Sequence, residues 1–196
     1  MGALKDWMGG MLAGFFGRDE EKSGETTMLV AGTVIALVAF PLLVIAFSRL
    51  VIRRFGTGLR KGVEGFIALV TIPLGLALLG WATWVFWRIG SGTPVPMAGP
   101  RELVTEGPYA HIRNPIQLGM MLYVLGLGTR AVNLPTGLVA ASLTGVLGAA
   151  YHALIEERDL ARRYGDDYLV YRQSTPFLVP QWRSLTGLFR RGGGEE

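Results

Sequence analysis

Two polar clusters in this sequence contain residue types that can do chemistry, and both adjoin long apolar runs. The first is GPYAHIRNP at residues 107–115, which leads directly into an apolar run. The second is the adjacent carboxylate pair Glu156 and Glu157, which directly follows another. Ionisable side chains are costly to hold at a membrane and commonly mark a functional site there. We therefore ask which elements could bring these two clusters together.

The composition indicates an integral membrane protein. The chain has 196 residues, half of them hydrophobic, and the apolar residues form long blocks. It has no cysteine and only two histidines, His111 and His152, so we expect no metal site. Most of the net charge of +4 lies beside the apolar blocks, where basic residues bind anionic lipid headgroups. No basic stripe interleaved with aromatic residues occurs, so we expect no nucleic-acid partner.

The apolar blocks predict an all-α, polytopic membrane protein. A helix needs about 20 apolar residues to cross a hydrocarbon core of ~30 Å. Four blocks approach or exceed that length, and the alternatives are a fifth crossing or an additional re-entrant segment. Pro41 is expected to kink the first helix, because proline removes a backbone hydrogen bond. The four predicted transmembrane helices are residues 28–51, 63–89, 115–132 and 136–155.

The last two predicted helices form a hairpin. Asn114 is expected to cap the third helix, with Pro115 as its first helical residue. The tight turn NLP at 133–135 leads into the fourth helix, whose small residues allow close packing. Because the two open ends of a hairpin lie on one membrane face, the loop at 90–114 and the segment after Glu156 can meet. The sequence thus predicts a polar pocket at one face of the membrane.

These boundaries divide the chain into four parts. Residues 1–17 are too short to span and lack a cleavage site, so we interpret them as an interfacial anchor. The predicted parts are an interfacial segment and linker at 1–26, two transmembrane helices at 27–89, a core at 90–180, and an interfacial turn and tail at 181–196.

The two clusters and the loop before them resemble a known group of enzymes. The segments IGSGTPVP at 89–96, LVTEGPYAHIRNPIQLG at 103–119 and EERDLARRYGDDYLVYRQSTPFLVP at 156–180 carry the resemblance. In this order, and separated by a helical hairpin, they are similar to the isoprenylcysteine carboxyl methyltransferase and phospholipid methyltransferase superfamily. The resemblance implies an integral membrane methyltransferase that uses S-adenosylmethionine. It covers roughly residues 90–180.

The resemblance also implies roles for individual residues. Gly90 and Gly92 match a GxG motif, Arg113 begins the family's Arg-His-Pro motif, and the acidic pair is likewise assigned to the cofactor. Two positions depart from the pattern, because Asn114 replaces a histidine and Gln117 stands where tyrosine is common. The residues expected at the cofactor are Gly90, Gly92, Tyr109, Arg113, Asn114, Glu156, Glu157 and Tyr168, with Tyr171 and Arg172 in a segment that closes the pocket.

The expected catalytic residues depend on the acceptor. A carboxylate acceptor is already ionised and needs only orientation, for which Arg172 is a candidate. An amine must first lose a proton, which His152 could accept, since it lies four residues before Glu156 on the same helical face. Tyr151 could contact the sulfonium group through its ring. We expect a phospholipid amine; the alternatives are an isoprenylcysteine-like carboxylate, or a membrane assembly protein without enzymatic activity.

The distribution of charged residues does not by itself determine the orientation of the protein in the membrane. The side with the long loop and both termini carries most of the Lys and Arg residues, but the short loop at 52–61 on the other side is densely basic. We expect a prokaryotic cytoplasmic membrane with the site facing the cytoplasm, and no oligomeric state follows from the sequence.

Overall fold

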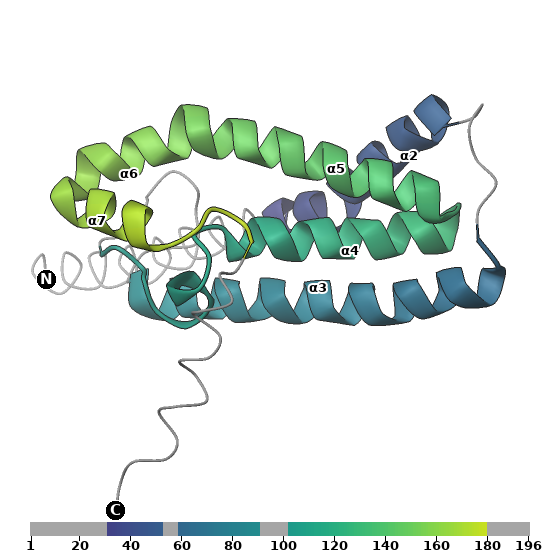
Figure 1. The fold of residues 1–196 in the computed structure, drawn as a ribbon, viewed down its shortest axis with the longest axis horizontal. Coiled ribbons are helices and arrows are strands. Elements are labelled where there is room, and N and C mark those ends of the chain that lie inside the picture. The colour runs from purple at the N-terminus through teal and green to yellow at the C-terminus, as the bar shows by residue number, and fades with distance from the viewer. Residues whose placement is uncertain (1–30, 53–58, 91–101, 180–196) are drawn as a thin grey trace, which may run out of the picture.

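The computed structural model describes residues 31–52, 59–90 and 102–179, and these residues are helical throughout, apart from short connections. Figure 1 shows α3, α4 and α5 lying side by side, with the first helix crossing them obliquely and α6 and α7 at one end. Among the described residues, no strand occurs. The elements are η1 Ile35–Ala39, α2 Phe40–Ile52, α3 Lys61–Gly90, η2 Gly107–Ala110, α4 Pro115–Ala131, α5 Leu134–Tyr151, η3 His152–Glu156, α6 Glu157–Tyr164 and α7 Asp166–Ser174.

Three of the helices are long and apolar enough to cross a membrane: Ala31–Ile52, Lys61–Ile89 and Leu134–Tyr164. Their outer surfaces carry large apolar side chains, such as Leu43 and Leu69, that are about 70% exposed. In water that exposure would be costly, whereas in lipid it is expected. The α-helical membrane protein predicted from the sequence is therefore confirmed, while α4, with 17 residues, is shorter than the three candidates.

Glycines set the spacing between neighbouring helices. A Cβ added to Gly75 of α3 would lie 2.6 Å from the Tyr123 backbone nitrogen and 2.7 Å from the Gly119 carbonyl oxygen, both on α4. A Cβ on Gly148 of α5 would overlap the Gln117 side chain, whose Nε2 donates to the Thr144 carbonyl at 2.7 Å. The close packing predicted from the small residues is thus present, and it includes backbone-to-backbone contact between α3 and α4.

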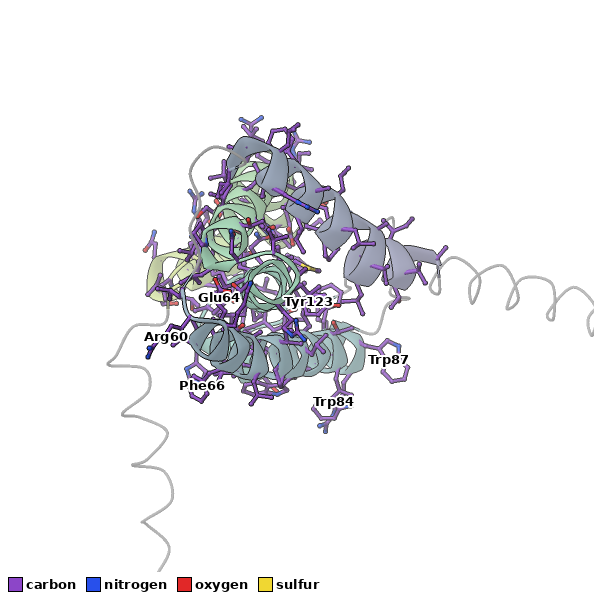
Figure 2. The ribbon with its side chains drawn as sticks, turned by 90° about the vertical axis from the view of Figure 1, so that its right-hand side faces the viewer. Arg60, Glu64, Phe66, Trp84, Trp87 and Tyr123 are labelled. Atoms are coloured by element: carbon purple, nitrogen blue, oxygen red, sulfur yellow. The ribbon has the colours of Figure 1, made fainter. Side chains whose placement is uncertain are left out.

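The first helix contains a proline whose effect is compensated from α4. Pro41 cannot donate a hydrogen bond to the carbonyl of Leu37, four residues earlier. The Tyr123 hydroxyl donates to that carbonyl at 3.1 Å instead, and the turn just before Pro41 is a π-helix. Figure 2 shows Tyr123 in the centre of the helix arrangement. The π turn before Pro41 is therefore hydrogen-bonded to the neighbouring helix α4 through the Tyr123 hydroxyl.

At the end of the bundle where α3 and α5 begin, a buried carboxylate links these two helices. Glu64, on the first turn of α3, is 2% exposed and lies toward the bundle interior (Figure 2). Its Oε1 accepts hydrogen bonds from the backbone nitrogens of Leu59 at 3.1 Å and Leu134 at 2.9 Å. Leu134 is the first residue of α5, whose N–H groups lack partners within their own helix. Glu64 thus caps α5 from α3 and fixes the two helices relative to each other.

Replacing Glu64 by leucine should lower the midpoint of thermal unfolding in mild detergent, because two partly buried N–H groups would lose their acceptor. Glu64→Gln retains a carbonyl oxygen and should lower the midpoint less. Circular dichroism at 222 nm on both variants tests this order. Equal midpoints for leucine and glutamine would show that the hydrogen bonds to Glu64 do not stabilise the bundle.

Aromatic side chains mark the opposite end of α3. Trp81, Trp84 and Trp87 are each about half exposed, and the Arg88 guanidinium lies 5.3 Å from the Trp84 ring centre. Figure 2 shows Trp84 and Trp87 pointing away from the other helices. Amphipathic rings near a helix end are typical of the membrane interface.

Candidate active site

A pocket lies at the end of the bundle where α3 ends and α4 begins. The space between its lining residues is about 490 Å³, which includes space open to solvent. One wall is apolar and the other carries ionisable groups. The lining residues are Phe86, Leu103, Val104, Tyr109, Arg113, Asn114, His152, Glu156, Glu157, Leu160, Tyr168 and Tyr171.

The segment before α4 forms one side of this pocket by folding back onto α3. Val104 and Tyr109 pack with Ala82 and Val85 in a buried cluster. The chain turns at Gly107, where φ is +59° and an added Cβ would lie 3.0 Å from the Val85 side chain. A residue with a side chain would be strained there, so glycine is required for the turn.

The next residues pair with the chain that follows α7. The Arg113 backbone nitrogen donates to the Pro176 carbonyl at 2.9 Å, and the Asn114 backbone nitrogen donates to the Phe177 carbonyl at 3.3 Å. The Asn114 side-chain amide donates to the same Phe177 carbonyl at 3.3 Å. Asn114 occupies the N-cap position with Pro115 after it, as predicted, but its side chain makes no capping hydrogen bond. The expectation of a side-chain cap is wrong, because the amide bonds the C-terminal segment instead.

Helix α7 closes the pocket from the other side. Tyr168 is 2% exposed, and the Tyr171 hydroxyl donates to the Tyr109 carbonyl at 2.8 Å. The chain reaches α7 through Gly165, whose φ of +55° ends α6. Two segments that are 62 residues apart in sequence are thereby joined across the pocket.

Glu157 is bound by two arginines. Its Oε1 contacts Nη1 of Arg113, and its Oε2 lies 3.3 Å from Nη2 of Arg172. The Arg113 and Glu157 side chains are 14% and 13% exposed, whereas Arg172 is half exposed. The Arg113 guanidinium also lies 5.5 Å from the Phe177 ring centre. Glu157 thus ties together the segment before α4, α6 and α7.

Glu156 has a different partner. One of its carboxylate oxygens contacts Nδ1 of His152, and the His152 ring lies edge-on to Phe177. His152 is 16% exposed at its side chain and Glu156 is 39% exposed. Residues 152–156 form a π turn, in which the Glu157 N–H bonds the His152 carbonyl. This extra residue in the turn lets His152, Glu156 and Glu157 all line the same pocket.

Comparison with known proteins identifies the family. Residues 63–167, more than half of the chain, match the family described as phospholipid methyltransferase. The chain belongs to the phospholipid methyltransferase family. The match runs from α3 through the first residues of α7 and includes both polar clusters. No curated protein and no solved structure gives a match.

Most of the residues predicted for this methyltransferase's site do line one pocket. Tyr109, Arg113, Asn114, His152, Glu156, Glu157 and Tyr168 all do so, and Arg172 reaches it only through Glu157. Tyr151 is 53% exposed and does not line the pocket, although its ring lies 5.7 Å from that of His152. Gly90 ends α3, and Gly92 lies outside the described residues.

The apolar wall of the methyltransferase pocket was missed from the sequence. Phe86 belongs to α3, and Leu103 and Val104 belong to the loop, where no periodic pattern identifies inward-facing residues. Leu160 was the easiest of these residues to predict, because it lies four residues after Glu156 on the same helical face.

Burial governs the protonation of the tyrosines in the methyltransferase pocket. It raises the pKa of Tyr109, Tyr168 and Tyr171 above the ordinary tyrosine value, and the neighbouring Glu156 carboxylate raises that of Tyr109 further. All three hydroxyls are therefore neutral near pH 7, and the Tyr171 hydroxyl donates to the Tyr109 carbonyl. Among the described residues, the Tyr109 hydroxyl, Nε of Arg113 and Nδ1 of His152 are buried and have no hydrogen-bond partner.

Proposed function

We propose that this protein transfers a methyl group from S-adenosylmethionine to a phospholipid amine at the membrane surface. The observation that carries the proposal is the pocket at the bundle end, where ionisable side chains from the loop before α4, the η3 turn and α6 converge beside lipid-exposed helices. A water-soluble cofactor can enter such a site from the aqueous side, and a lipid can enter from the bilayer.

The donor set of the pocket fits this cofactor. Its methionine carboxylate needs donors, and the buried Tyr109 hydroxyl and Arg113 Nε offer two that lack partners among the described residues. The side-chain oxygen of Asn114, which lines the pocket, suits the ammonium group or a ribose hydroxyl of the cofactor. Phe86 and Leu160 supply apolar surface for the adenine or for the lipid. We assign Tyr109, Arg113, Asn114 and Tyr168 to the cofactor.

The chemistry requires little more than alignment and a free nucleophile. When bound, the cofactor supplies an electrophilic methyl group, and the acceptor's lone pair forms a bond to that carbon while the carbon–sulfur bond breaks, its electron pair staying on sulfur. The protein's part is to orient the acceptor, to exclude water and to accept a proton. Orientation of two reactants can contribute ~7–11 kcal/mol to the rate.

An amine acceptor suits the charges of the pocket better than a carboxylate does. A carboxylate acceptor would compete with Glu157 for Arg113 and Arg172. Glu156, which contacts His152 and not an arginine, adds negative charge that attracts an ammonium group and repels a carboxylate. Isoprenylcysteine-like carboxyl methylation is therefore the second candidate.

We also propose four crossings, with α4 as the third, in a prokaryotic cytoplasmic membrane whose cytoplasmic side holds the pocket. Seventeen helical residues rise ~26 Å, close to the hydrocarbon thickness, and α4 lies between α3 and α5 (Figure 1).

The proposal is tested by incubating the purified protein in mixed micelles with radiolabelled S-adenosylmethionine and a total lipid extract, followed by chromatography. Label on methylated derivatives of phosphatidylethanolamine is the expected result. Label confined to prenylated thiol compounds would favour the carboxylate acceptor. No label, together with no heat of binding for S-adenosylhomocysteine, would indicate a non-enzymatic membrane assembly protein.

A further inference from the structure

We propose that the two adjacent glutamates have separate tasks: Glu156 and His152 form a proton-accepting pair for an amine acceptor, and Glu157 is a positioning residue that holds Arg113 and Arg172. This inference rests on the proposed methyl transfer to an amine. It differs from the expectation that both carboxylates bind the cofactor.

The contacts of the two carboxylates support the division. One oxygen of Glu156 contacts Nδ1 of His152 and the side chain is 39% exposed, whereas both oxygens of Glu157 contact arginines and the side chain is 13% exposed. Nδ1 is buried and makes no hydrogen bond within the described residues, so its contact with Glu156 is a close approach of the two groups. In the proposed pair the Nδ1 proton is directed at that carboxylate, which leaves Nε2 with the lone pair that accepts a proton.

The backbone explains why this pair sits beside Glu157. In a regular α-helix, the direction of the side chain turns by about 100° from one residue to the next. The π turn at residues 152–156 changes that phase immediately before α6. As a result His152, Glu156 and Glu157 line one pocket even though the two glutamates are adjacent in sequence. π turns of this kind are frequent at functional sites.

No other group lining the pocket is as well suited to accept the proton. The charged and titratable groups that line the pocket with His152 are Glu156 and Glu157 from η3 and α6, Tyr109 and Arg113 from the loop before α4, and Tyr168 and Tyr171 from α7. Tyr151, which does not line the pocket, has its ring 5.7 Å from that of His152. The three pocket tyrosines are already protonated, since burial raises the pKa of each. Glu157 is neutralised by two guanidinium groups, and Arg113 is a permanent cation.

The proton balance follows from these positions. The acceptor arrives as an ammonium, its N–H bond breaks, and the electron pair stays on nitrogen as the nucleophile. The proton goes to Nε2 of His152, and the imidazolium is stabilised by the Glu156 carboxylate. Because Glu156 is partly exposed, the proton can then pass to water, which returns the imidazole to its neutral form. A second methylation needs the same step again.

Three variants separate the tasks: His152→Gln, Glu156→Gln and Glu157→Gln, with Asp159→Asn as the matched control. Asp159 is an exposed carboxylate of α6 that pairs with Arg163 at 2.8 Å and does not line the pocket. Binding of S-adenosylhomocysteine is measured by calorimetry, and initial rates of methyl transfer to phosphatidylethanolamine in mixed micelles are measured from pH 5.5 to 9.5.

His152→Gln and Glu156→Gln should each reduce the turnover at pH 7 about 100-fold, in line with the usual contribution of a general base. Their deficit should shrink as the pH rises, because hydroxide then removes the proton, and their affinity for S-adenosylhomocysteine should stay within about 3-fold of wild type. Glu157→Gln should weaken that binding at least 10-fold, since Arg113 and Arg172 lose their shared anchor. Asp159→Asn should change neither quantity.

A readout that does not depend on activity is nitrogen NMR of the histidine side chains. The chain has two histidines, so His152→Gln assigns the resonances. The ring-nitrogen signals of His152 should shift in Glu156→Gln and remain in place in Asp159→Asn. An unshifted His152 signal in Glu156→Gln would overturn the proton-accepting pair.

Two further outcomes bear on the inference and on the function separately. If the wild type methylates the amine lipid but Glu156→Gln loses cofactor affinity as strongly as it loses turnover, Glu156 is a cofactor ligand and the division of tasks is wrong. If the wild type binds S-adenosylhomocysteine yet transfers no methyl group to any amine lipid, both the proposed amine acceptor and the proposed proton-accepting pair are wrong.

Discussion

Replacing Arg113 by alanine should weaken the binding of S-adenosylhomocysteine at least 100-fold and destabilise the protein by about 3 kcal/mol. The Arg113 side chain is 14% exposed, and its guanidinium contacts Glu157, lies over the Phe177 ring and has a buried Nε donor. Its removal leaves Glu157 with only the half-exposed Arg172. Breaking a buried ion pair by removing one partner typically costs ~3–5 kcal/mol, and the second arginine keeps this case at the low end.

Arg113→Lys separates the two effects. Lysine keeps the charge opposite Glu157 but lacks the planar fork and its additional donors. It should restore most of the thermal stability in mild detergent while leaving the affinity at least 10-fold below wild type. Calorimetry and thermal unfolding on the same samples measure both quantities. Wild-type affinity for S-adenosylhomocysteine in either variant would show that Arg113 has only a structural role and does not contact the cofactor.

The meeting of the two polar clusters was predictable, and the physical reason is topology. Once residues 115–132 and 136–155 are taken as a hairpin, their open ends must lie on one membrane face, whatever their exact bounds. The structure places α4 and α5 as antiparallel neighbours with the clusters at one end (Figure 1). The predicted fourth helix began at Thr136, whereas α5 begins at Leu134, because the Asn133 side chain accepts a hydrogen bond from the Thr136 nitrogen.

The pairing inside the pocket was not predictable, because it depends on contacts between segments far apart in sequence. The sequence placed Arg113 at the cofactor and Arg172 in the segment that closes the pocket, and the structure pairs both with Glu157. Helical spacing placed His152 beside Glu156, and this was confirmed. The residues HALIE at 152–156 do not predict a π turn, because their side chains have no distinctive propensity for one.

The same limit applies to Asn114. Its position before Pro115 identified a helix start correctly, but the choice between capping that helix and bonding the Phe177 carbonyl is decided by where the C-terminal segment lies. Local rules state what a side chain can do, and tertiary structure selects among the options.

Gly75→Ala should destabilise the protein by about 3 kcal/mol and reduce methyl transfer. The added methyl group would meet the Tyr123 nitrogen at 2.6 Å and the Gly119 carbonyl oxygen at 2.7 Å. Both atoms belong to the backbone of α4, so no side chain can rotate away and the two helices must move apart. Overpacking of this kind costs ~1–3 kcal/mol, and more where the contact is rigid.

Gly80→Ala, on the same helix, is the matched control. Nothing lies within 4 Å of a Cβ at this position, so the substitution should be neutral or stabilise the protein by up to ~1 kcal/mol through helix propensity. Thermal unfolding in mild detergent compares the two variants. Similar midpoints would mean that α3 and α4 do not touch at Gly75.

The activity of Gly75→Ala tests how the bundle supports the site. Helix α3 carries Phe86 on one wall of the pocket, and α4 begins directly after Arg113 and Asn114 on another. Separating the two helices therefore shifts the walls relative to each other, and displacements of ~1 Å can cost about 100-fold in rate. Gly80→Ala should retain wild-type turnover, because it leaves that spacing unchanged. A stable Gly75→Ala protein with full activity would show that the pocket is positioned by the contacts of α7 and the loop before α4, independently of the spacing between α3 and α4.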